Sequence, residues 1–438
     1  MIYALLLAFF IVEYVRPASY VPAMDILKLN TLIPLSAFAG TLVSAGPTAI
    51  QRITSDRVTM LVAALYGLIW MSFPTADVQQ LAWDAQLIVL GYVIVFWVVA
   101  TEVNSIARVK GVIVTLIVAH LIVTALNPAL LTDPSQRHYI SSGSFLGDGN
   151  DLALSLDLIV PLCVFLVLDA RKALHKAVWM AALVVLIASV VSTQSRGGTI
   201  GLGAMAAYYW AKSARKAQMG LIAVAVLLMI LVLAPGAYFD RMATMGDTTE
   251  GSAQGRITAW TAAMRMAMDN PVFGVGAAHF GTKIGNEYRP AGFVGSGMNA
   301  HSLYFLALGE LGIPGLVVVI WLIAANLSAN ARLAKELRQR GVASTSTEMQ
   351  LLGSSSASMI AFATAGAFLS ALYYPHLYVL SGLMMAVRHV VREGVVTAEA
   401  RQQPVELPAD SPLGRKVSLH WSLQSRKPAW NARRHDPR

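Results

Sequence analysis

The sequence has 438 residues, of which 56% are hydrophobic and only 13% charged, and its mean hydropathy is +0.59. This composition excludes a water-soluble protein, in which about a quarter of the residues are normally charged. The net charge of +9 does not indicate a nucleic-acid partner, because most of the 33 Lys and Arg residues fall in short loops and a C-terminal tail. An all-α polytopic membrane protein is predicted, since the apolar runs are too long and continuous for barrel strands.

Runs of apolar residues predict about twelve transmembrane helices, since a spanning helix needs about 20 apolar residues. The first run has neither a basic n-region nor a small-residue cleavage site, so we interpret it as a short helix and not as a cleaved signal. The predicted spans are residues 1–15, 30–46, 58–73, 83–101, 109–127, 151–169, 176–194, 198–212, 217–235, 302–328, 354–373 and 375–391.

Positive charge near the helix ends predicts the orientation of these spans. With the N-terminus in the cytoplasm, most Lys and Arg residues fall on the cytoplasmic side, as topology favours. The predicted organisation is transmembrane helices 1–9 over residues 1–234, a large outer loop with short helices over 235–301, helices 10–12 over 302–391 and a basic cytoplasmic tail over 392–438. The tail has no apolar periodicity, so we expect it to be disordered.

Arg196 lies in the turn Gln194–Gly198 (QSRGG), at the predicted outer junction of two apolar spans. A guanidinium at this depth needs protein, water or an anion beside it. Gly197 and Gly198 allow a backbone or a ligand to approach closely and supply free amides. Snorkelling of Arg196 to lipid headgroups is the alternative. The tight glycine turn favours a binding role.

Two further arginines lie in the outer loop, on an amphipathic helix predicted to end at Asn270–Pro271. At about 100° per residue, Arg256 and Arg265 are separated by roughly half a turn and cannot share one face of a straight helix. Arg256 shares its face with apolar residues, which suits packing. Arg265 shares its face with polar residues, which suits a ligand site, and is preferred if only one of them binds.

His301 follows a glycine-rich stretch and begins the tenth predicted span at the water boundary, on the side of the arginines. Its ordinary pKa near 6.5 suits a general base at neutral pH. Asn299 is predicted to cap the helix that follows. Glu310 lies inside that span among glycines and Pro314, which should bend or closely pack the helix. An intramembrane acid normally has a partner, so we expect Glu310 to pair with an arginine and position it.

Five short motifs, in this order and topology, resemble the O-antigen ligase and polymerase superfamily of bacterial envelope glycosyltransferases. The resemblance covers roughly residues 140–390 and implies a multi-pass protein of the inner membrane with its active site on the periplasmic side. It also implies catalysis by His301 and pyrophosphate binding by Arg196 with Arg265, Arg256 or both, while Ser302 is assigned no role. The matching motifs are Ser195–Gly198, Arg256 with Trp260, Asn270–Gly276, Ala300–Tyr304 and Leu311–Leu316.

The resemblance implies transfer of an O-antigen glycan from undecaprenyl pyrophosphate to a sugar hydroxyl of lipid A–core oligosaccharide. Arginines would bind the pyrophosphate and stabilise its charge as it leaves, and His301 would remove the proton of the hydroxyl. A single displacement inverts the anomeric centre. Because arginine supplies the positive charge, no metal and no cofactor are expected, and the partners are the two glycolipids and membrane lipids.

Other functions remain open at this level. An O-antigen polymerase and a protein O-oligosaccharyltransferase use the same donor, and the acceptor depends on the shape of the cleft. A transporter or flippase for lipid-linked glycans is an alternative of another class. Transport predicts functional polar residues near the middle of the membrane, whereas here they collect at the predicted outer face.

Overall fold

The structure is a computed structural model, and it describes residues 1–133, 140, 145–234, 236–243, 251–289 and 298–402. By internal contacts the chain divides into two units, Met1–Val391 and Arg392–Arg438. Within the described residues the secondary structure is helical, without strands, which confirms the all-α prediction. The predicted disorder of the tail falls mainly on residues 403–438, which lie outside the described residues.

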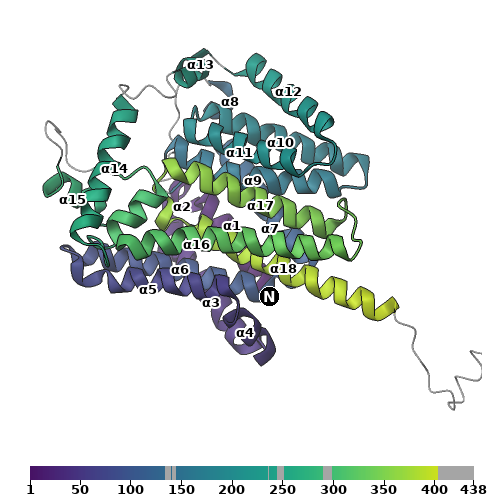
Figure 1. Ribbon diagram of the computed structural model, residues 1–438, viewed down its shortest axis with the longest axis horizontal. Coiled ribbons are helices and arrows are strands. Elements are labelled where there is room, and N and C mark those ends of the chain that lie inside the picture. The colour runs from purple at the N-terminus through teal and green to yellow at the C-terminus, as the bar shows by residue number, and fades with distance from the viewer. Residues whose placement is uncertain (134–139, 141–144, 235, 244–250, 290–297, 403–438) are drawn as a thin grey trace, which may run out of the picture. The chain divides into compact units, whose positions relative to one another are not determined.

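The first third of the chain contains eight α-helices and two 3₁₀ turns among the described residues (Figure 1). They are α1 (Ile2–Val15), α2 (Pro17–Tyr20), η1 (Pro22–Leu27), α3 (Leu29–Ser44), α4 (Pro47–Thr54), α5 (Arg57–Met71), η2 (Phe73–Thr75), α6 (Gln79–Glu102), α7 (Ile106–Leu126) and α8 (Ala129–Thr132).

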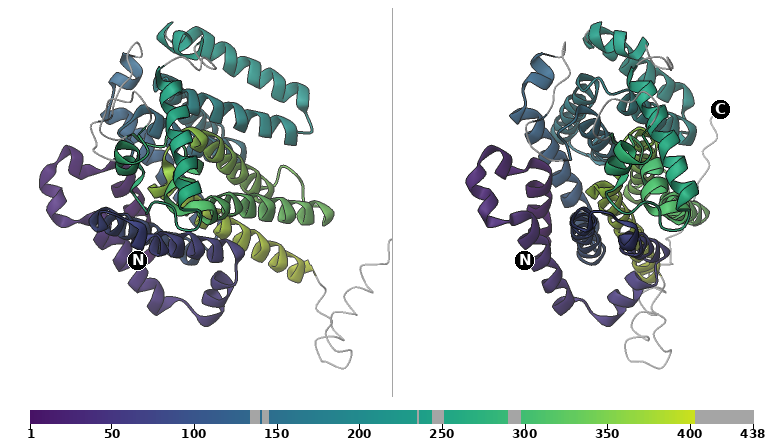
Figure 2. Two further views of the ribbon diagram at one scale, coloured as in Figure 1. Left: turned by 60° about the vertical axis from the view of Figure 1, so that its left-hand side comes forward. Right: turned by 90° about the vertical axis from the view of Figure 1, so that its left-hand side faces the viewer.

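The rest of the chain continues with ten α-helices and two 3₁₀ turns in the part that the structure describes (Figure 2). They are α9 (Gly149–Asp169), α10 (Ala173–Ser192), α11 (Arg196–Lys212), α12 (Lys216–Leu233), α13 (Gly236–Ala243), α14 (Gly251–Asp269), α15 (Phe280–Asn286), α16 (Leu303–Gln339), α17 (Thr347–Ala365), η3 (Gly366–Phe368), η4 (Ala371–Tyr373) and α18 (Pro375–Gln402).

Eight helical segments of the described chain are long and apolar enough to cross a membrane, as a multi-pass protein requires. Each predicted span overlaps a helix, but α1, α11, α12 and α18 do not belong to these eight, so the count of twelve stays a prediction. Three predicted ends were wrong. The span predicted over 354–373 ends as a helix at Ala365, and the helices predicted over 302–328 and 375–391 continue to Gln339 and Gln402.

Helix α9 lies at the centre of the larger unit and packs against α7, α10, α11 and α17. Most of its apolar span is buried, in contrast to that of α3. Close packing depends on small residues, because a Cβ atom on Gly198 of α11 would lie 2.7 Å from the Cβ of Ala153 in α9. The glycines after Arg196 therefore allow two helices to approach each other.

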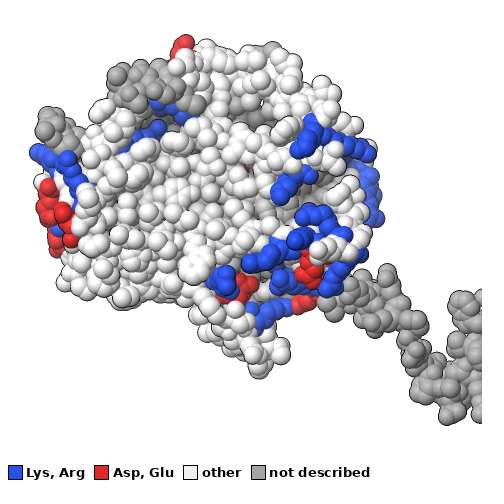
Figure 3. Space-filling model, viewed as in Figure 1, with Lys and Arg blue, Asp and Glu red and all other residues white. Residues whose placement is uncertain are grey.

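Charged side chains gather near the two ends of the long helices (Figure 3). Lys and Arg dominate at the right-hand end of this view, where α16 ends, and a smaller group of mixed sign lies at the left, near α15. The surface between them is nearly uncharged. This is the distribution expected of a helical bundle whose middle faces hydrocarbon.

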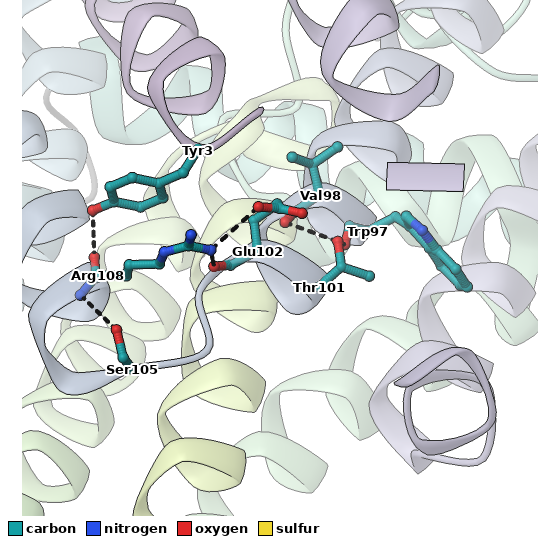
Figure 4. A network of polar contacts seen from close by, with 7 residues as sticks. All are labelled: Tyr3, Trp97, Val98, Thr101, Glu102, Ser105 and Arg108. Atoms are coloured by element: carbon teal, nitrogen blue, oxygen red, sulfur yellow. Dashed lines mark hydrogen bonds and ion pairs between the residues drawn. The ribbon is translucent and has the colours of Figure 1, made fainter. Parts of the chain in front are cut away.

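Helix α1 is held at its start by a polar network with the turn between α6 and α7 (Figure 4). The Tyr3 hydroxyl donates to the carbonyl oxygen of Arg108 at 2.7 Å, and the Arg108 guanidinium lies 5.0 Å from the centre of the Tyr3 ring. The same guanidinium donates to the Glu102 carbonyl at 2.6 Å, and the Ser105 hydroxyl caps α7. These contacts fix a helix that is short for a span.

A double-mutant cycle between Tyr3 and Gly111 tests this anchor. A Cβ atom on Gly111 would collide with the Tyr3 hydroxyl, so Gly111→Ala should lower the free energy of unfolding by about 1–3 kcal/mol. Tyr3→Phe removes the colliding oxygen and should cost about 0.5–1.5 kcal/mol alone. The double variant should be more stable than the sum predicts, as measured by denaturation in mixed detergent micelles. Additive effects would contradict the contact.

Candidate active site

A short segment between α17 and α18 connects the residues singled out in the sequence. This 366–374 segment consists of η3, Leu369, Ser370, η4 and Tyr374. Pro375 accounts for its end, since the residue before a proline avoids the helical conformation and Tyr374 is extended (φ −103°, ψ 153°). Its side chains reach Arg256 through Phe368, the His301 backbone through Ser370 and Glu310 through Tyr373.

Arg196 is the first residue of α11 and is only 9% exposed. The Ser195 hydroxyl caps the helix by accepting the Gly198 N–H at 3.2 Å. The Arg196 Nε donates to the Arg241 carbonyl of α13 at 3.2 Å, which links the helix start to the loop that follows α12. A Cβ on Gly197 would lie 3.2 Å from the Cβ of Phe368, so this end of α11 packs directly against the 366–374 segment.

Arg256 reaches the same side chain from α14. Its guanidinium carbon lies 5.9 Å from the centre of the Phe368 ring, a cation–π contact. Phe368 therefore has the start of α11 on one side and Arg256 on another, although the two arginines are far apart in sequence. The helix face that Arg256 shares is apolar as predicted, because Ala263 and Ala267 are buried.

Arg265 points to a different surface. It is exposed, and within the described residues no hydrogen bond or ion pair involves it. The two arginines of α14 thus occupy different faces, as their spacing predicts. Of the pair, Arg256 is the one that the structure brings toward Arg196. Of the polar stripe that favoured Arg265 in the sequence, Arg265 and Asp269 are exposed, and Thr258 and Thr261 are half-buried.

The backbone of His301 is held from two directions. Its N–H donates to the Ser370 hydroxyl at 2.9 Å, and the preceding carbonyl of Ala300 accepts the Trp260 Nε1–H at 3.1 Å. The Trp260 ring also stacks on Phe305 at 5.0 Å between centroids. His301 has a φ of +48°, which is uncommon outside glycine and persists only where the surroundings impose it.

The predicted cap of α16 was wrong. Asn299 is exposed and lies before the helix, whereas Ser302 is the N-cap and its side chain accepts the Phe305 N–H at 3.4 Å. Serine and asparagine cap about equally well, so sequence alone does not choose between two candidates three residues apart. The left-handed backbone at His301 decides which residue caps α16. It prevents the helix from starting directly after Asn299 and leaves Ser302 at the N-cap position.

Glu310 is buried, and its partners are not arginines, which corrects the predicted ion pair. Its carboxylate accepts the backbone N–H groups of Ala278 at 2.9 Å and of Phe280 at 2.8 Å, and also the Tyr373 hydroxyl. A buried carboxylate needs such donors in place of water. Glu310 therefore joins α16, the start of α15 and the 366–374 segment.

The predicted bend in α16 occurs at Gly312, which has a φ of +69°. The loop before α15 pairs with the broken backbone there: Val275 N–H donates to the Gly309 carbonyl at 3.0 Å and Ile313 N–H to the Pro271 carbonyl at 2.9 Å. A Cβ on Gly312 would lie 2.6 Å from the Pro271 carbonyl oxygen, so only glycine fits. The loop and the kink thus support each other.

Helix α15 is fixed on its other side by Lys283 and His279. The Lys283 ammonium pairs with Asp77 at 2.7 Å and Glu287 at 2.6 Å. Burial alone would lower the pKa of Lys283, but the two carboxylates outweigh it and the pKa is raised. The buried His279 ring accepts the Val78 N–H through Nε2 at 2.9 Å. These contacts join α15 to the turn before α6.

A cavity of about 740 Å³ lies between α15, the start of α16 and the 366–374 segment. Its wall includes Gly281, Asn286, Arg289, Asn299, Ser370 and Tyr373. Ser370 also binds the His301 N–H, so the cavity borders the histidine backbone. Across the part of the chain that the structure describes, no three His, Cys, Asp or Glu side chains gather as a metal site would need.

The sequence reasoning missed Phe368, Ser370 and Tyr373. All three lie in a run that was assigned to a transmembrane helix because its mean hydropathy is high. Two features of the sequence indicate a break in this helix. Gly366 and the polar Ser370 interrupt the apolar run, and they are followed by the triplet Tyr373–Pro375. The residue before a proline is more often extended or in a turn than helical.

Removing one oxygen from Glu310 tests its role as a junction. Glu310→Gln leaves one oxygen for the two backbone N–H groups, so one of them loses its carboxylate acceptor, at a cost of about 1–3 kcal/mol. Tyr373→Phe removes only one hydroxyl and should cost about 0.5–1.5 kcal/mol. Thermal unfolding in detergent would rank the two variants. Equal stability of Glu310→Gln and wild type would contradict the junction.

Comparison with known families finds a match over the part of the chain that contains the predicted site residues. Residues 181–320 match a family model described as O-antigen ligase. The matched region includes Arg196, Arg256, Arg265, His301 and Glu310, but not the 366–374 segment. No curated protein matches the chain. Over residues 181–320 the chain is therefore similar to the O-antigen ligase family.

Proposed function

We propose that this protein is an inverting, metal-independent glycosyltransferase of the bacterial inner membrane. It transfers an O-antigen glycan from undecaprenyl pyrophosphate to a sugar hydroxyl of lipid A–core oligosaccharide at the periplasmic face. One observation carries the proposal: Arg256 and the start of α11 at Arg196 meet at Phe368, two residues from the Ser370 hydroxyl that holds His301.

Arg196 and Arg256 are proposed to bind the pyrophosphate of the donor. A guanidinium presents a planar set of N–H donors that fits phosphate oxygens, and it stays charged at all physiological pH values. These two guanidiniums, together with the N-terminal end of α11 at Arg196, would provide positive charge where the leaving group becomes more negative. Arg265 remains a third candidate, because its exposed side chain is open to solvent and lipid headgroups.

His301 is proposed to act as the general base. The bond between the anomeric carbon and the pyrophosphate oxygen breaks, the acceptor oxygen bonds to that carbon from the opposite face, and the hydroxyl proton passes to the imidazole. Pyrophosphate leaves as an anion and needs no proton. The restraints on His301 from Ser370 and Trp260 serve this step, because a base acts only when it is held within hydrogen-bond reach of the proton.

The site lies where helices begin and end, not in their middle. Arg196 begins α11, His301 precedes α16 and Phe368 follows the end of α17. Both proposed substrates have long lipid tails and polar heads, so their reacting groups lie at the boundary of the membrane. A flippase would instead need its polar site near the middle of the spans, which makes transport the weaker alternative.

Replacing His301 tests the base. His301→Asn keeps a side chain that tolerates the left-handed backbone, so the fold should be retained. Transfer should fall by about 10²–10⁴-fold because no group removes the proton. The assay combines purified protein, undecaprenyl-pyrophosphate-linked O-antigen and O-antigen-free lipopolysaccharide with a chelator, and a gel is read for high-mass lipopolysaccharide. Normal transfer by the folded variant would refute the assignment.

The products of the same assay separate the members of the superfamily. High-mass lipopolysaccharide means a ligase, whereas a lengthened donor with unmodified lipopolysaccharide means a polymerase. Glycan on an added protein acceptor means a protein O-oligosaccharyltransferase. Loss of activity with chelator, restored by a divalent cation, would contradict the metal-independent mechanism.

A matched pair of variants separates the two arginines of α14. Arg256→Lys should lower kcat/KM for the donor by about tenfold or more, since an ammonium lacks the planar fork. Arg265→Lys should have a smaller effect, because Arg265 lies on a different face from the Phe368 contact. Steady-state kinetics with varied donor would measure both. The opposite ranking would make Arg265 the pyrophosphate ligand and Arg256 a packing residue.

A further inference from the structure

We infer that the cavity of about 740 Å³ beside His301 is the binding site of the acceptor saccharide, an inference that rests on the proposed function. Three features carry it. They are the order of contacts along the 366–374 segment, the chemistry of the cavity wall and the rigidity of that wall.

The 366–374 segment places the cavity and the arginines at different points. Phe368 contacts Arg256 and the start of α11, Ser370 binds the His301 backbone, and Tyr373 and Tyr374 line the cavity. An inverting displacement needs the attacking hydroxyl opposite the leaving group, with the base beside the hydroxyl. If the pyrophosphate lies at the arginines, the attacking sugar belongs on the cavity side of His301.

The wall of the cavity has the groups that bind sugars. Asn286 and Asn299 supply amides, while Thr282 and Ser370 supply hydroxyls. Amides and hydroxyls both donate and accept hydrogen bonds, as the hydroxyls of a saccharide do. The ring of Tyr374 adds an aromatic surface for the apolar face of a pyranose. Arg289 at the same wall suits an anionic substituent on the saccharide.

The wall is built before any ligand arrives. Glu310 lies in it and binds the start of α15 and Tyr373, which are two other parts of the same wall. On its far side α15 is held by the pairing of Lys283 with Asp77 at 2.7 Å. A site fixed in this way loses little conformational entropy when a ligand binds, and it selects for the shape of its ligand.

Gly281 offers a way to fill the cavity with little disturbance of the fold. It lines the cavity within α15, and a Cβ there would meet only the Met298 carbonyl oxygen, at an ordinary 3.8 Å. Gly281→Ala is therefore a matched control with the same backbone restriction. Gly281→Phe places a ring in the space that the saccharide would take. Thermal unfolding would check that both variants are folded.

The first measurement is binding to full-length protein in nanodiscs. The probe is the water-soluble oligosaccharide released from O-antigen-free lipopolysaccharide, followed by calorimetry. Wild type and Gly281→Ala should bind it with similar Kd, and Gly281→Phe should weaken binding at least tenfold. Undecaprenyl pyrophosphate should bind all three proteins equally. Wild-type oligosaccharide affinity in folded Gly281→Phe, or an equal loss of undecaprenyl pyrophosphate binding, would overturn the inference.

The second measurement is kinetic and uses Asn286→Ala, whose side chain is exposed in the cavity wall. The KM for lipopolysaccharide acceptor should rise severalfold with little change in the KM for donor. A rise in the donor KM alone would overturn the inference. The binding assay needs no turnover, so a protein that binds oligosaccharide but transfers nothing would refute the proposed function and leave the saccharide site standing.

Discussion

The buried carboxylate of Glu310 accepts hydrogen bonds from the backbone of Ala278 and Phe280 and from the Tyr373 hydroxyl. Three parts of the chain meet at this one group: the first turns of α16, the start of α15 and the 366–374 segment. A carboxylate in an apolar helix is costly when unpaired, so each donor has to stay in place. The positions of the loop before α15, of Tyr373 and of the cavity wall therefore depend on it.

The 366–374 segment connects Glu310 to the other residues of the candidate site. A continuous helix over these residues would point successive side chains around its circumference. The two 3₁₀ turns instead direct Phe368, Ser370 and Tyr373 to three different elements. Their contacts reach Arg256 of α14, the His301 backbone close before α16, and Glu310 within α16. The interruption of an apolar run thus has the same use as broken helices elsewhere in membrane proteins, where irregular backbone is tolerated only when it is covered by protein or lines a cavity.

Positive backbone φ angles recur around this site, at His301, Ala278, Gly274 and Gly312. Glycine accommodates the last two, where a Cβ would strike the backbone of the facing segment. His301 and Ala278 have no such freedom, and each is held by a hydrogen bond from its own N–H, to Ser370 and to Glu310. Residues in this conformation cost about 1–3 kcal/mol and persist where the surroundings enforce them. The same contacts that impose the strain also fix the imidazole-bearing residue.

The sequence by itself determined the all-helical fold, the positions of nearly all the long helices and the region of the candidate site, because apolar runs and glycine-rich turns are local properties that the chain records directly. It also identified Arg196, Arg256, Arg265, His301 and Glu310 as the residues to consider. Only the tertiary structure decided which of them meet. The helical periodicity placed the two arginines of α14 on different faces, but it did not predict that Phe368 would contact Arg256. Hydropathy assigned most of the 366–374 segment to a transmembrane span, because a turn that is buried against other helices is as apolar as a helix in lipid. Glu310 binds backbone N–H groups at the start of α15. Every residue except proline has such a group, so the sequence does not indicate which of them a carboxylate will bind.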